Sequence, residues 1–394
     1  CEPVLATSVQ ASESQEFAMH FGDVRDRFRL LVLDGFRSDL DGRRIRTNGI
    51  KSSAHVYRAL KSAIEQSQPG HVYVPYGNFL ARTAALPFGL TRALRKADAE
   101  AETLLISGRY LQPPRGIAQS LRQRFLLELI SRGPWENVFH LDDVAIEQFT
   151  NHGGRMAQLG KLMPDPHSET PTMDRIAARE QFGLPVDGRA IAVVGLIEKR
   201  KGLAALMQAM RDASTRLRPT DRLFLIGPQH PEAQAMLAGE FADLVAAGRV
   251  VMHDRRLSTD EIGHAIRAAD VLATCYLHHP YTSSILIAAA AAERPVLGAD
   301  TGWIGRTIDQ FGLGHTCDPF VRESIADSLV ASLDASQHYQ PTEAGRRFVE
   351  FSTDRNYVAH WTARLRERIG LGPSPDLRTW QWALGGEGCL ARAA

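Results

Sequence analysis

The sequence has 394 residues, of which 44% are hydrophobic and 23% are charged. This length favours two domains over one hydrophobic core, and this composition excludes a disordered chain and a small disulfide scaffold. Its 46 Lys and Arg residues almost balance its 45 Asp and Glu residues, so no overall field draws the protein onto nucleic acid.

The longest apolar run without glycine covers residues 285–292, far short of the roughly 20 residues that a membrane-spanning helix needs. The cysteines are widely spaced and form no C-x-x-C pair, which argues against a structural zinc site. Residues 1–15 lack the basic start and apolar stretch of a signal peptide. We therefore expect a cytoplasmic protein with no bound metal.

Short β-branched runs alternate with helical patterns along the chain, which is typical of parallel α/β layers. The expected strands of the first half are residues 29–36, 71–77, 103–110 and 137–143. Those of the second half are residues 190–197, 222–227, 249–254, 270–276 and 295–301. A polar, proline-rich stretch between the halves places the domains at 1–167 and 168–394. The end of the chain, 370–394, is irregular and is expected to be loosely held.

Two helices of the second half follow from their apolar periodicity. The first begins after Gly202 and has an apolar stripe of Leu203, Leu206, Met207 and Met210. The second begins with a capping box, Ser258 with Glu261, and its buried face is expected to hold Ile262, Ala265, Ile266 and Ala269. Both patterns are those of helices that cover a sheet.

A basic amphipathic helix is expected in the first half, over residues 115–133. Its apolar residues are Ile117, Leu121, Phe125, Leu129 and Ile130, and its basic residues are Arg115, Arg122, Arg124 and Arg132. Such a helix can lie on anionic lipid, at the inner face of a membrane. A helix that packs on the sheet and turns a cationic face to solvent explains the pattern equally well, and we favour that interpretation.

A cationic turn follows the expected strand at 190–197. The apolar run ends at Gly195, the residues Glu-Lys-Arg-Lys follow at 198–201, and Gly202 opens a helix. Positive side chains at the carboxyl edge of a parallel sheet suit an anionic ligand. A solvated turn explains the same charges, and the spacing does not fit a Walker loop.

A polar head also opens the alanine-rich helix near residue 285. Thr282, Ser283 and Ser284 bring hydroxyls and free backbone N–H groups to a positive helix end, where phosphate is favourable. A capped core helix without a ligand is the alternative for this segment.

Together, these segments make residues 174–355 resemble the carboxyl-terminal domain of the family 4 retaining glycosyltransferases. The resemblance rests on the order and spacing of four stretches, which begin REQFGLPVDGR, RLFLIGPQ, RVVMHDRRL and PYTSSILIA. It implies an α/β protein with the GT-B architecture, in which two Rossmann-like domains face a central cleft. The first domain would bind the acceptor and the second the donor.

The resemblance also implies a metal-independent, retaining transfer of a sugar from a nucleotide-sugar co-substrate, with no cofactor. The acceptor would be a carbohydrate, a lipid-linked glycan or a small molecule, as in cell-surface polysaccharide biosynthesis, and no nucleic acid is expected as a partner. Two rivals stay open: an inactive relative that acts as a binding or scaffolding subunit, and a nucleotide-sugar epimerase.

The family's functional positions fall on residues of the second half. Lys201, with Arg200 beside it, would pair with the donor diphosphate and stabilise the leaving charge. The donor-binding positions are Gly195, His253, Asp254, Arg255, His279, Thr282, Ser283 and Ser284. Among these, the turn at 253–255 would lie along the nucleobase, and the helix start would cap the distal phosphate.

Three positions depart from the family pattern. Leu196 stands where an arginine is common, so Arg200 or Arg255 would supply the second cation. The paired glutamates of the family would fall near Pro280 and at Ala288, and neither position is acidic. The loop His-His-Pro-Tyr at 278–281 is a candidate substitute, with imidazole donors facing sugar hydroxyls, although a neutral histidine pair on the surface is the simpler interpretation.

The first half offers acceptor-binding candidates at expected strand ends. These are Asn78, Ser107, Arg109 and Tyr110. His140 is a candidate base, but a lone histidine on a strand is more often a hydrogen-bonded structural residue.

Overall fold

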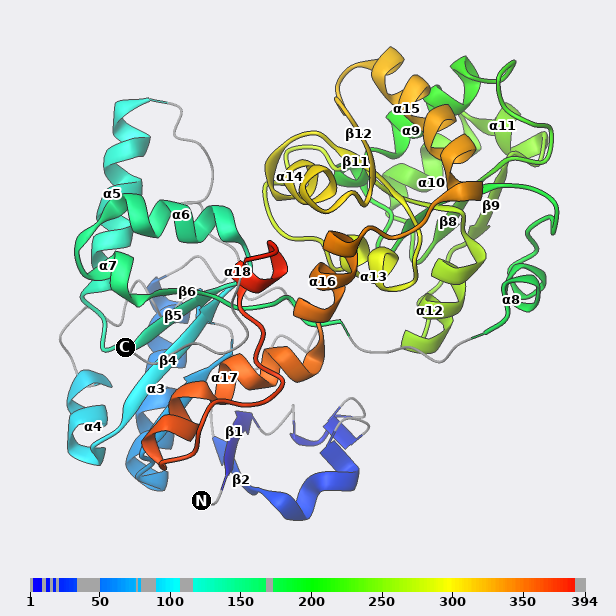
Figure 1. Cartoon of the computed structure of the whole chain (residues 1–394). Helices are drawn as coiled ribbons and strands as arrows, with labels where there is room; N and C mark the ends of the chain where they lie inside the picture. The colour runs from blue at the N-terminus through cyan, green and yellow to red at the C-terminus, as the bar shows by residue number, and fades with distance from the viewer. Residues whose placement is uncertain are drawn as a thin grey trace. The chain divides into compact units, whose positions relative to one another are not determined.

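The protein is described by a computed structural model that covers residues 3–8, 12–14, 17–18, 21–33, 50–75, 77–78, 90–106, 116–167 and 173–386. It divides into two compact units, Cys1–Leu162 and Met163–Ala394 (Figure 1). The division falls five residues before the boundary expected at residue 167.

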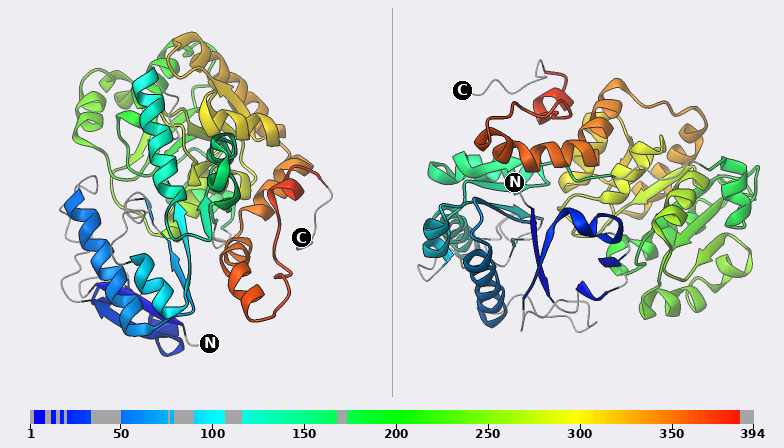
Figure 2. Two further views of the ribbon diagram at one scale, coloured as in Figure 1. Left: turned by 90° about the vertical axis from the view of Figure 1, so that its left-hand side faces the viewer. Right: turned by 90° about the horizontal axis from the view of Figure 1, so that it is seen from below.

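The first unit is built on a parallel sheet of four strands in sequential order, β3-β4-β5-β6, beside a parallel pair, β1-β2 (Figure 2). The strands are β1 Val4–Ser8, β2 Arg29–Leu33, β3 His71–Val74, β4 Glu100–Leu105, β5 Asn137–His140 and β6 Gly160–Leu162. Its helical elements are η1 Gly22–Arg27, α3 Ile50–Ser67, α4 Leu90–Ala97, α5 Ile117–Ser131, α6 Asp143–His152 and α7 Gly154–Leu159. The sequence predicted strands at the positions of β2 to β5 and missed β1 and β6.

The helix α5 corrects the packing that we favoured for residues 115–133. Ile130 is buried, as expected, but Ile117, Leu121 and Phe125 are exposed. The helix therefore turns part of its apolar surface away from the core of its unit. None of the helices described in either unit combines the length and the apolar composition that crossing a bilayer requires.

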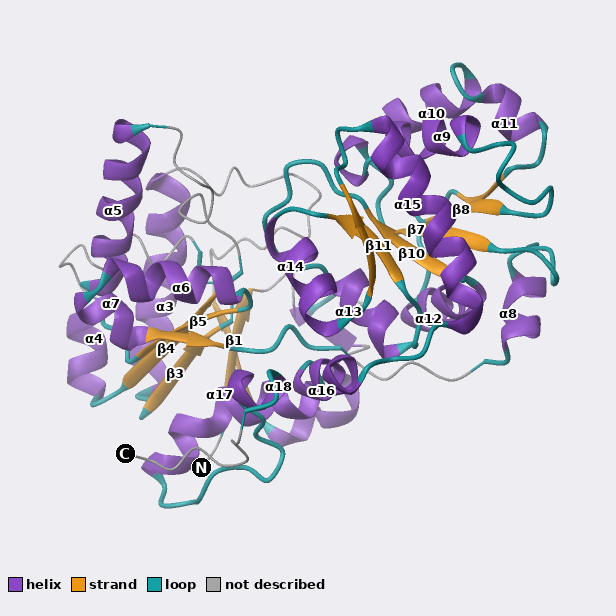
Figure 3. Cartoon of the chain, turned by 45° about the horizontal axis from the view of Figure 1, so that its top comes forward, coloured by secondary structure: helices purple, strands orange, loops and turns teal. Residues whose placement is uncertain are grey.

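The second unit contains a six-stranded parallel sheet in the order β12-β11-β10-β7-β8-β9, with helices on both faces (Figure 3). Its strands are β7 Ala190–Val194, β8 Arg222–Ile226, β9 Val250–His253, β10 Val271–Thr274, β11 Val296–Ala299 and β12 Gly314–Cys317. Its helices up to β12 are α8 Arg175–Gln181, α9 Leu203–Asp212, α10 Pro231–Ala238, α11 Ala242–Ala246, α12 Thr259–Ala268, α13 Ser284–Ala291 and α14 Gly302–Phe311, with the short turn η4 Lys199–Lys201. After β12 come α15 Arg322–Ala335, η5 Ser336–His338, α16 Glu343–Phe351, α17 Asp354–Arg368 and α18 Trp380–Ala383. The five predicted strands and both predicted helices are confirmed, and β12 was missed.

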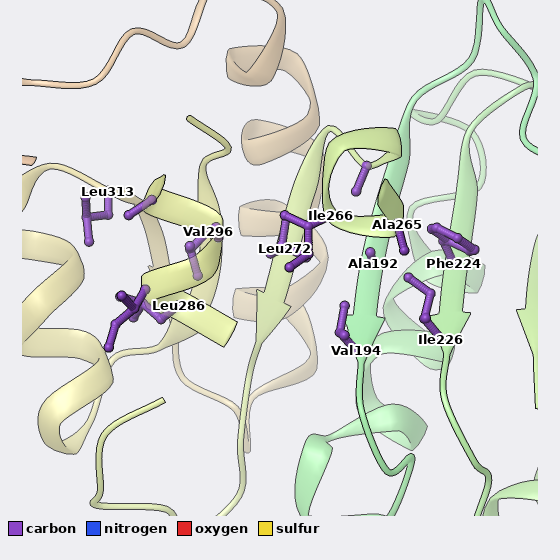
Figure 4. Packing of buried hydrophobic residues seen from close by; sticks show 14 of the residues in the cluster. Ala192, Val194, Phe224, Ile226, Ala265, Ile266, Leu272, Leu286, Val296 and Leu313 are labelled. Carbon is purple, nitrogen blue, oxygen red and sulfur yellow. The ribbon is translucent and has the colours of Figure 1, made fainter. Parts of the chain in front are cut away.

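Alternation along β7 fills two cores, one on each face of this sheet, because successive strand residues point to opposite faces. Ala192 and Val194 point into the core that α12, α13 and α14 cover (Figure 4). Ile191 and Val193 point into the core that α9 and α15 cover. Every β7 residue is buried, which accounts for its continuous apolar run.

A buried arginine fixes the amino edge of the sheet. Arg179 of α8 is 0% exposed, and its guanidinium donates to the carbonyl of Gly188 at 2.7 Å and to Asp270 at 3.0 Å. The Asp270 carboxylate also accepts from the backbone N–H of Ala190 at 2.7 Å. These contacts join the starts of β7 and β10 to α8, so the buried charge is paired and hydrogen-bonded.

The expectation of a loosely held carboxyl terminus is wrong as far as residue 386. The ring of Trp380 in α18 makes edge contacts with Phe311 and Phe351, with ring centres 5.5 and 5.1 Å apart. Asn356 accepts a hydrogen bond of 2.8 Å from the backbone N–H of Arg378. Trp380 therefore attaches this segment to the core of the unit. The irregular polar sequence around it gave no indication of this packing.

The strand order gives the second unit a topological switch point between β7 and β10. The chain builds β7, β8 and β9 outward in one direction and β10, β11 and β12 outward in the other. The loops that leave the carboxyl ends of β7 and β10 therefore diverge to opposite sides. In open α/β sheets, ligands bind at such a point.

Candidate functional site

The cationic turn is held against the end of β10. Gly202 adopts a left-handed conformation, with φ of 71°, and a Cβ there would collide with the carbonyl oxygen of Cys275. The backbone N–H of Leu277 donates to the carbonyl of Arg200 at 2.8 Å. Glycine is required at 202 both for its backbone conformation and for this close approach.

Lys201 lies at the carboxyl end of β7, with its ammonium next to Gly195. Its side chain is buried, and its ammonium donates a hydrogen bond to the carbonyl of Val194. A Cβ at Gly195, where φ is 90°, would lie 3.2 Å from Nζ. Burial, together with the positive charge of Arg200, lowers the pKa of Lys201 from 10.5 to about 8 against the opposing charge of Glu198. The amine therefore remains mostly protonated at neutral pH.

Tyr276 connects this lysine to the start of α13. The Lys201 Nζ and the Arg200 guanidinium carbon each lie 5.2 Å from the centre of the Tyr276 ring, within the range of cation–π attraction. The Tyr276 hydroxyl is hydrogen-bonded to Ser283, and burial raises its pKa. Tyr276 was not predicted as a site residue, because its only signal in the sequence is an aromatic residue directly after a strand.

His279 makes a second connection between the turn and the start of α13. Its Nδ1 lies 3.4 Å from Nη1 of Arg200, and its Nε2 lies 3.1 Å from the carbonyl oxygen of Thr282. Burial lowers the pKa of His279, so the ring is neutral at pH 7. A neutral ring that donates from Nε2 to Thr282 keeps Nδ1 as an acceptor for Arg200. We call Arg200, Lys201, Tyr276, His279 and Ser283 the switch-point cluster.

The two predicted serines have different surroundings at the start of α13. Ser283 is buried and is the N-cap, and its hydroxyl accepts from the backbone N–H of Leu286 at 3.4 Å. Ser284 is exposed at the first helical position. The N–H groups of Ser284 and Ile285 have no acceptor within the helix, and they carry its positive dipole end. The arrangement brings cations and a helix N-terminus to one edge, which suits an anion.

Asp165 is a second residue beside the site that was not predicted from the sequence. It is half-buried, and its carboxyl is hydrogen-bonded to Thr282 beside the start of α13. Burial raises the pKa of Asp165 from 3.8 to about 6, against the opposing effect of that hydrogen bond. The signal in the sequence was only the segment PDPH, at 164–167.

The three residues of the turn at 253–255 all have partners within the unit. His253 Nε2 lies 3.1 Å from the carbonyl oxygen of Phe182. The Asp254 carboxylate accepts hydrogen bonds at 2.8 Å from the backbone N–H of Gln229 and at 2.7 Å from the side-chain amide of Gln234. The guanidinium of Arg255 pairs with Glu261 in the first turn of α12, with atoms 2.6 Å apart.

These contacts indicate which arginine supplies the second cation beside Lys201. Arg255 pairs with Glu261 of α12, and Arg200 pairs with Glu198 at 3.0 Å. Arg200 also lies against the ring of Tyr276, which Lys201 contacts as well. The geometry therefore favours Arg200 over Arg255 beside Lys201. Leu196, where the resemblance leads us to expect an arginine, is 47% exposed just beyond Gly195.

The first unit gives less information on the predicted acceptor site. Ser107, Arg109 and Tyr110 lie outside the described residues. Asn78 accepts a hydrogen bond of 2.9 Å from the backbone N–H of Ile106, after β4.

His140 is positioned as a structural residue. It is 0% exposed, it accepts from the backbone N–H of Asp142 at 3.0 Å, and burial lowers its pKa to about 3. A group so difficult to protonate is a poor general base near neutral pH. Across the described residues, no group of three or more His, Cys, Asp or Glu side chains is placed to hold a metal ion.

No family model and no curated protein matches the sequence. Solved structures do match the fold. HepE from Anabaena, solved with UDP, superposes with a TM-score of 0.62 at 14% identity, over 94% of this chain and 100% of its own. Sucrose-phosphate synthase from Thermosynechococcus elongatus gives 0.64 at 16% identity, over 88% of this chain and 84% of its own.

A glycosyltransferase from Rickettsia africae gives a TM-score of 0.64 at 12% identity, over 93% of this chain and 90% of its own. At such identities the similarity establishes the architecture. The chain has the GT-B fold of these glycosyltransferases, with two Rossmann-like α/β domains.

Proposed function

We propose that the protein is a glycosyltransferase that uses a nucleotide-sugar donor. The observation that carries this proposal is the switch-point cluster, in which Lys201 and Arg200 meet the start of α13 through Tyr276 and His279. A nucleoside diphosphate is the anion that suits two cations and a helix N-terminus at a switch point. The structures of HepE with UDP and with UDP-glucose support the same class of ligand.

In this proposal, the second unit binds the donor and the first unit binds the acceptor. Lys201 and Arg200 pair with the diphosphate, and the N–H groups at Ser284 point to its distal phosphate. As the glycosidic bond to the diphosphate breaks, negative charge accumulates on the leaving oxygen, and these preorganised groups stabilise it. The acceptor hydroxyl attacks on the face that the diphosphate leaves, so the anomeric configuration is retained, and no metal is required.

A second candidate is a binding or scaffolding subunit that keeps the fold without the reaction. Two observations favour it: Ala288 lies where the resemblance expects a glutamate, and the Lys201 ammonium is buried against the Val194 carbonyl. In this case the lysine would serve as a structural cation.

A ligand panel separates these candidates. Thermal unfolding should be measured with UDP, GDP, ADP and their sugar conjugates, with a chelator present. A bound nucleotide at 100 times its dissociation constant stabilises the fold by about 2.7 kcal/mol. The proposal expects one nucleotide to raise the Tm and its conjugate to be consumed when acceptor glycans are added, with NMR showing retention at the anomeric carbon.

The other outcomes are equally distinct. If no nucleotide or sugar conjugate in the panel raises the Tm, the proposed function is contradicted. Binding without turnover supports the binding subunit, and sugar isomerisation without an acceptor would indicate an epimerase. Loss of turnover with the chelator, restored by a divalent ion, would contradict the metal-independent mechanism.

A further inference from the structure

The amino-terminal half of α5 exposes large apolar side chains. Ile117, Leu121 and Phe125 are 80%, 60% and 62% exposed. They are spaced four residues apart, so they form one stripe along the helix. Figure 1 shows the first turns of α5 standing clear of α6 and α7.

The opposite side of α5 provides its attachment to the unit. Leu127 and Ile130 are buried, and α5 contacts α6 and α7. The guanidinium of Arg155 donates to the carbonyl of Ser131 at 3.1 Å. The exposed stripe is therefore not needed to attach α5 to the unit. Exposing these large apolar side chains to water is unfavourable, and packing within the unit gives no reason for it.

Positive charge accompanies this stripe. Arg122 and Arg124 are exposed next to Leu121 and Phe125, and neither has an ion-pair partner within the described part of the chain. One helical turn later the pattern changes, because Arg132 pairs with Glu128 at 2.9 Å. The apolar half of the exposed face is thus also the half with unpaired cations.

We propose that the exposed face of α5, formed by Ile117, Leu121, Arg122, Arg124 and Phe125, docks on an anionic phospholipid surface. The apolar side chains enter the boundary between headgroups and acyl chains, and the arginines pair with lipid phosphates beside them. A negatively charged bilayer satisfies both features at once, whereas a neutral bilayer or a purely polar partner satisfies one. This inference is independent of the donor site.

The test is co-sedimentation of the protein with vesicles. Vesicles of phosphatidylcholine alone are compared with vesicles of equal parts phosphatidylcholine and phosphatidylglycerol, at low and high salt. The wild-type protein should sediment with the anionic vesicles, and salt should weaken this binding.

Two variants resolve the contributions of the face. Ile117→Ser, Leu121→Ser and Phe125→Ser together should lower the partition coefficient at least about tenfold. Arg122→Gln with Arg124→Gln should lower it about 30-fold on anionic vesicles, at roughly fivefold per arginine, and leave the neutral vesicles unaffected. Both variants change exposed residues, so circular dichroism should show unchanged folding.

The matched control changes Ile176→Ser and Val186→Ser, which are 50% and 46% exposed in the second unit. This control should bind anionic vesicles like the wild type. Equal binding of the α5 serine variant, or no wild-type binding to either vesicle, would overturn the proposal. A dimer seen by light scattering that the serine variant abolishes would also overturn it, since the face would then join two copies of the chain.

Discussion

At the scale of single residues, Lys201 is a cation that the fold buries and supplies with a hydrogen-bond acceptor. Burial disfavours the charged ammonium, and the carbonyl of Val194 compensates by accepting its hydrogen bond. With a pKa of about 8, the amine keeps most of its charge at pH 7. An incoming diphosphate would stabilise the protonated form further, so ligand binding and protonation of Lys201 favour each other.

Asp165 gives a prediction on stability against pH. Its raised pKa means that the folded protein holds this proton more tightly than the unfolded chain does. Stability should therefore fall as pH rises from about 4 to about 6, by at most about 3 kcal/mol. Asp165→Asn removes this cost while keeping an oxygen to accept from Thr282.

We expect the Asp165→Asn protein to unfold at a higher temperature than the wild type above pH 6 and to match it below pH 4. Thermal unfolding across this range measures the difference. An Asn variant that is less stable than the wild type at pH 7 would show that the ionised carboxylate stabilises the fold.

At the scale of elements, a glycine sets the distance between β11 and α14. A Cβ at Gly298 would collide with Ile308 and would lie 2.8 Å from Cγ2 of Ile304 and 2.9 Å from Oγ1 of Thr274. Both isoleucines belong to the core between the sheet and α14. Close packing of this helix on the strand therefore requires the absence of a side chain at 298.

Gly298→Ala should lower the free energy of unfolding by about 1 to 3 kcal/mol through overpacking. Gly372→Ala is the matched control, because a Cβ there meets nothing within 4 Å. Chemical denaturation of both variants measures the effect. Equal stability of the two would mean that the core accommodates the added methyl group and that the close approach is not needed.

The elements differ in how far the sequence revealed them. Helices α9 and α12 were predictable because their apolar residues recur at helical spacing and the capping box of α12 forms as expected. The strand β12, Gly314–Cys317, was missed because it is short, begins with glycine and reads GHTC rather than as a β-branched run. We expected the apolar stripe of α5 to pack on the sheet, and this was wrong. Apolar residues at helical spacing indicate that a face is buried, but they do not indicate which surface covers it.

At the scale of the whole molecule, the strand order decides where the site forms. The sequence located the cationic turn and the polar helix start as separate local patterns, and placed them on one ligand only through the resemblance. It did not give the order β12-β11-β10-β7-β8-β9, which makes β7 and β10 neighbours and brings the two segments together. Tyr276 and Asp165 were missed because their partners, Lys201 and Thr282, lie far away along the chain.

The most direct test of the proposed donor site is calorimetric titration of the nucleotide selected by the ligand panel into two lysine variants. Lys199→Ala and Lys201→Ala remove the same charge from the same turn, but Lys199 is exposed and Lys201 lies in the switch-point cluster. Loss of a charge-assisted contact worth about 1.5 to 3 kcal/mol should weaken binding to Lys201→Ala about 10- to 150-fold. Lys199→Ala should bind within about threefold of the wild type, as expected for a solvated charge. Equal affinities of the two variants, with both folded, would contradict the claim that Lys201 holds the diphosphate.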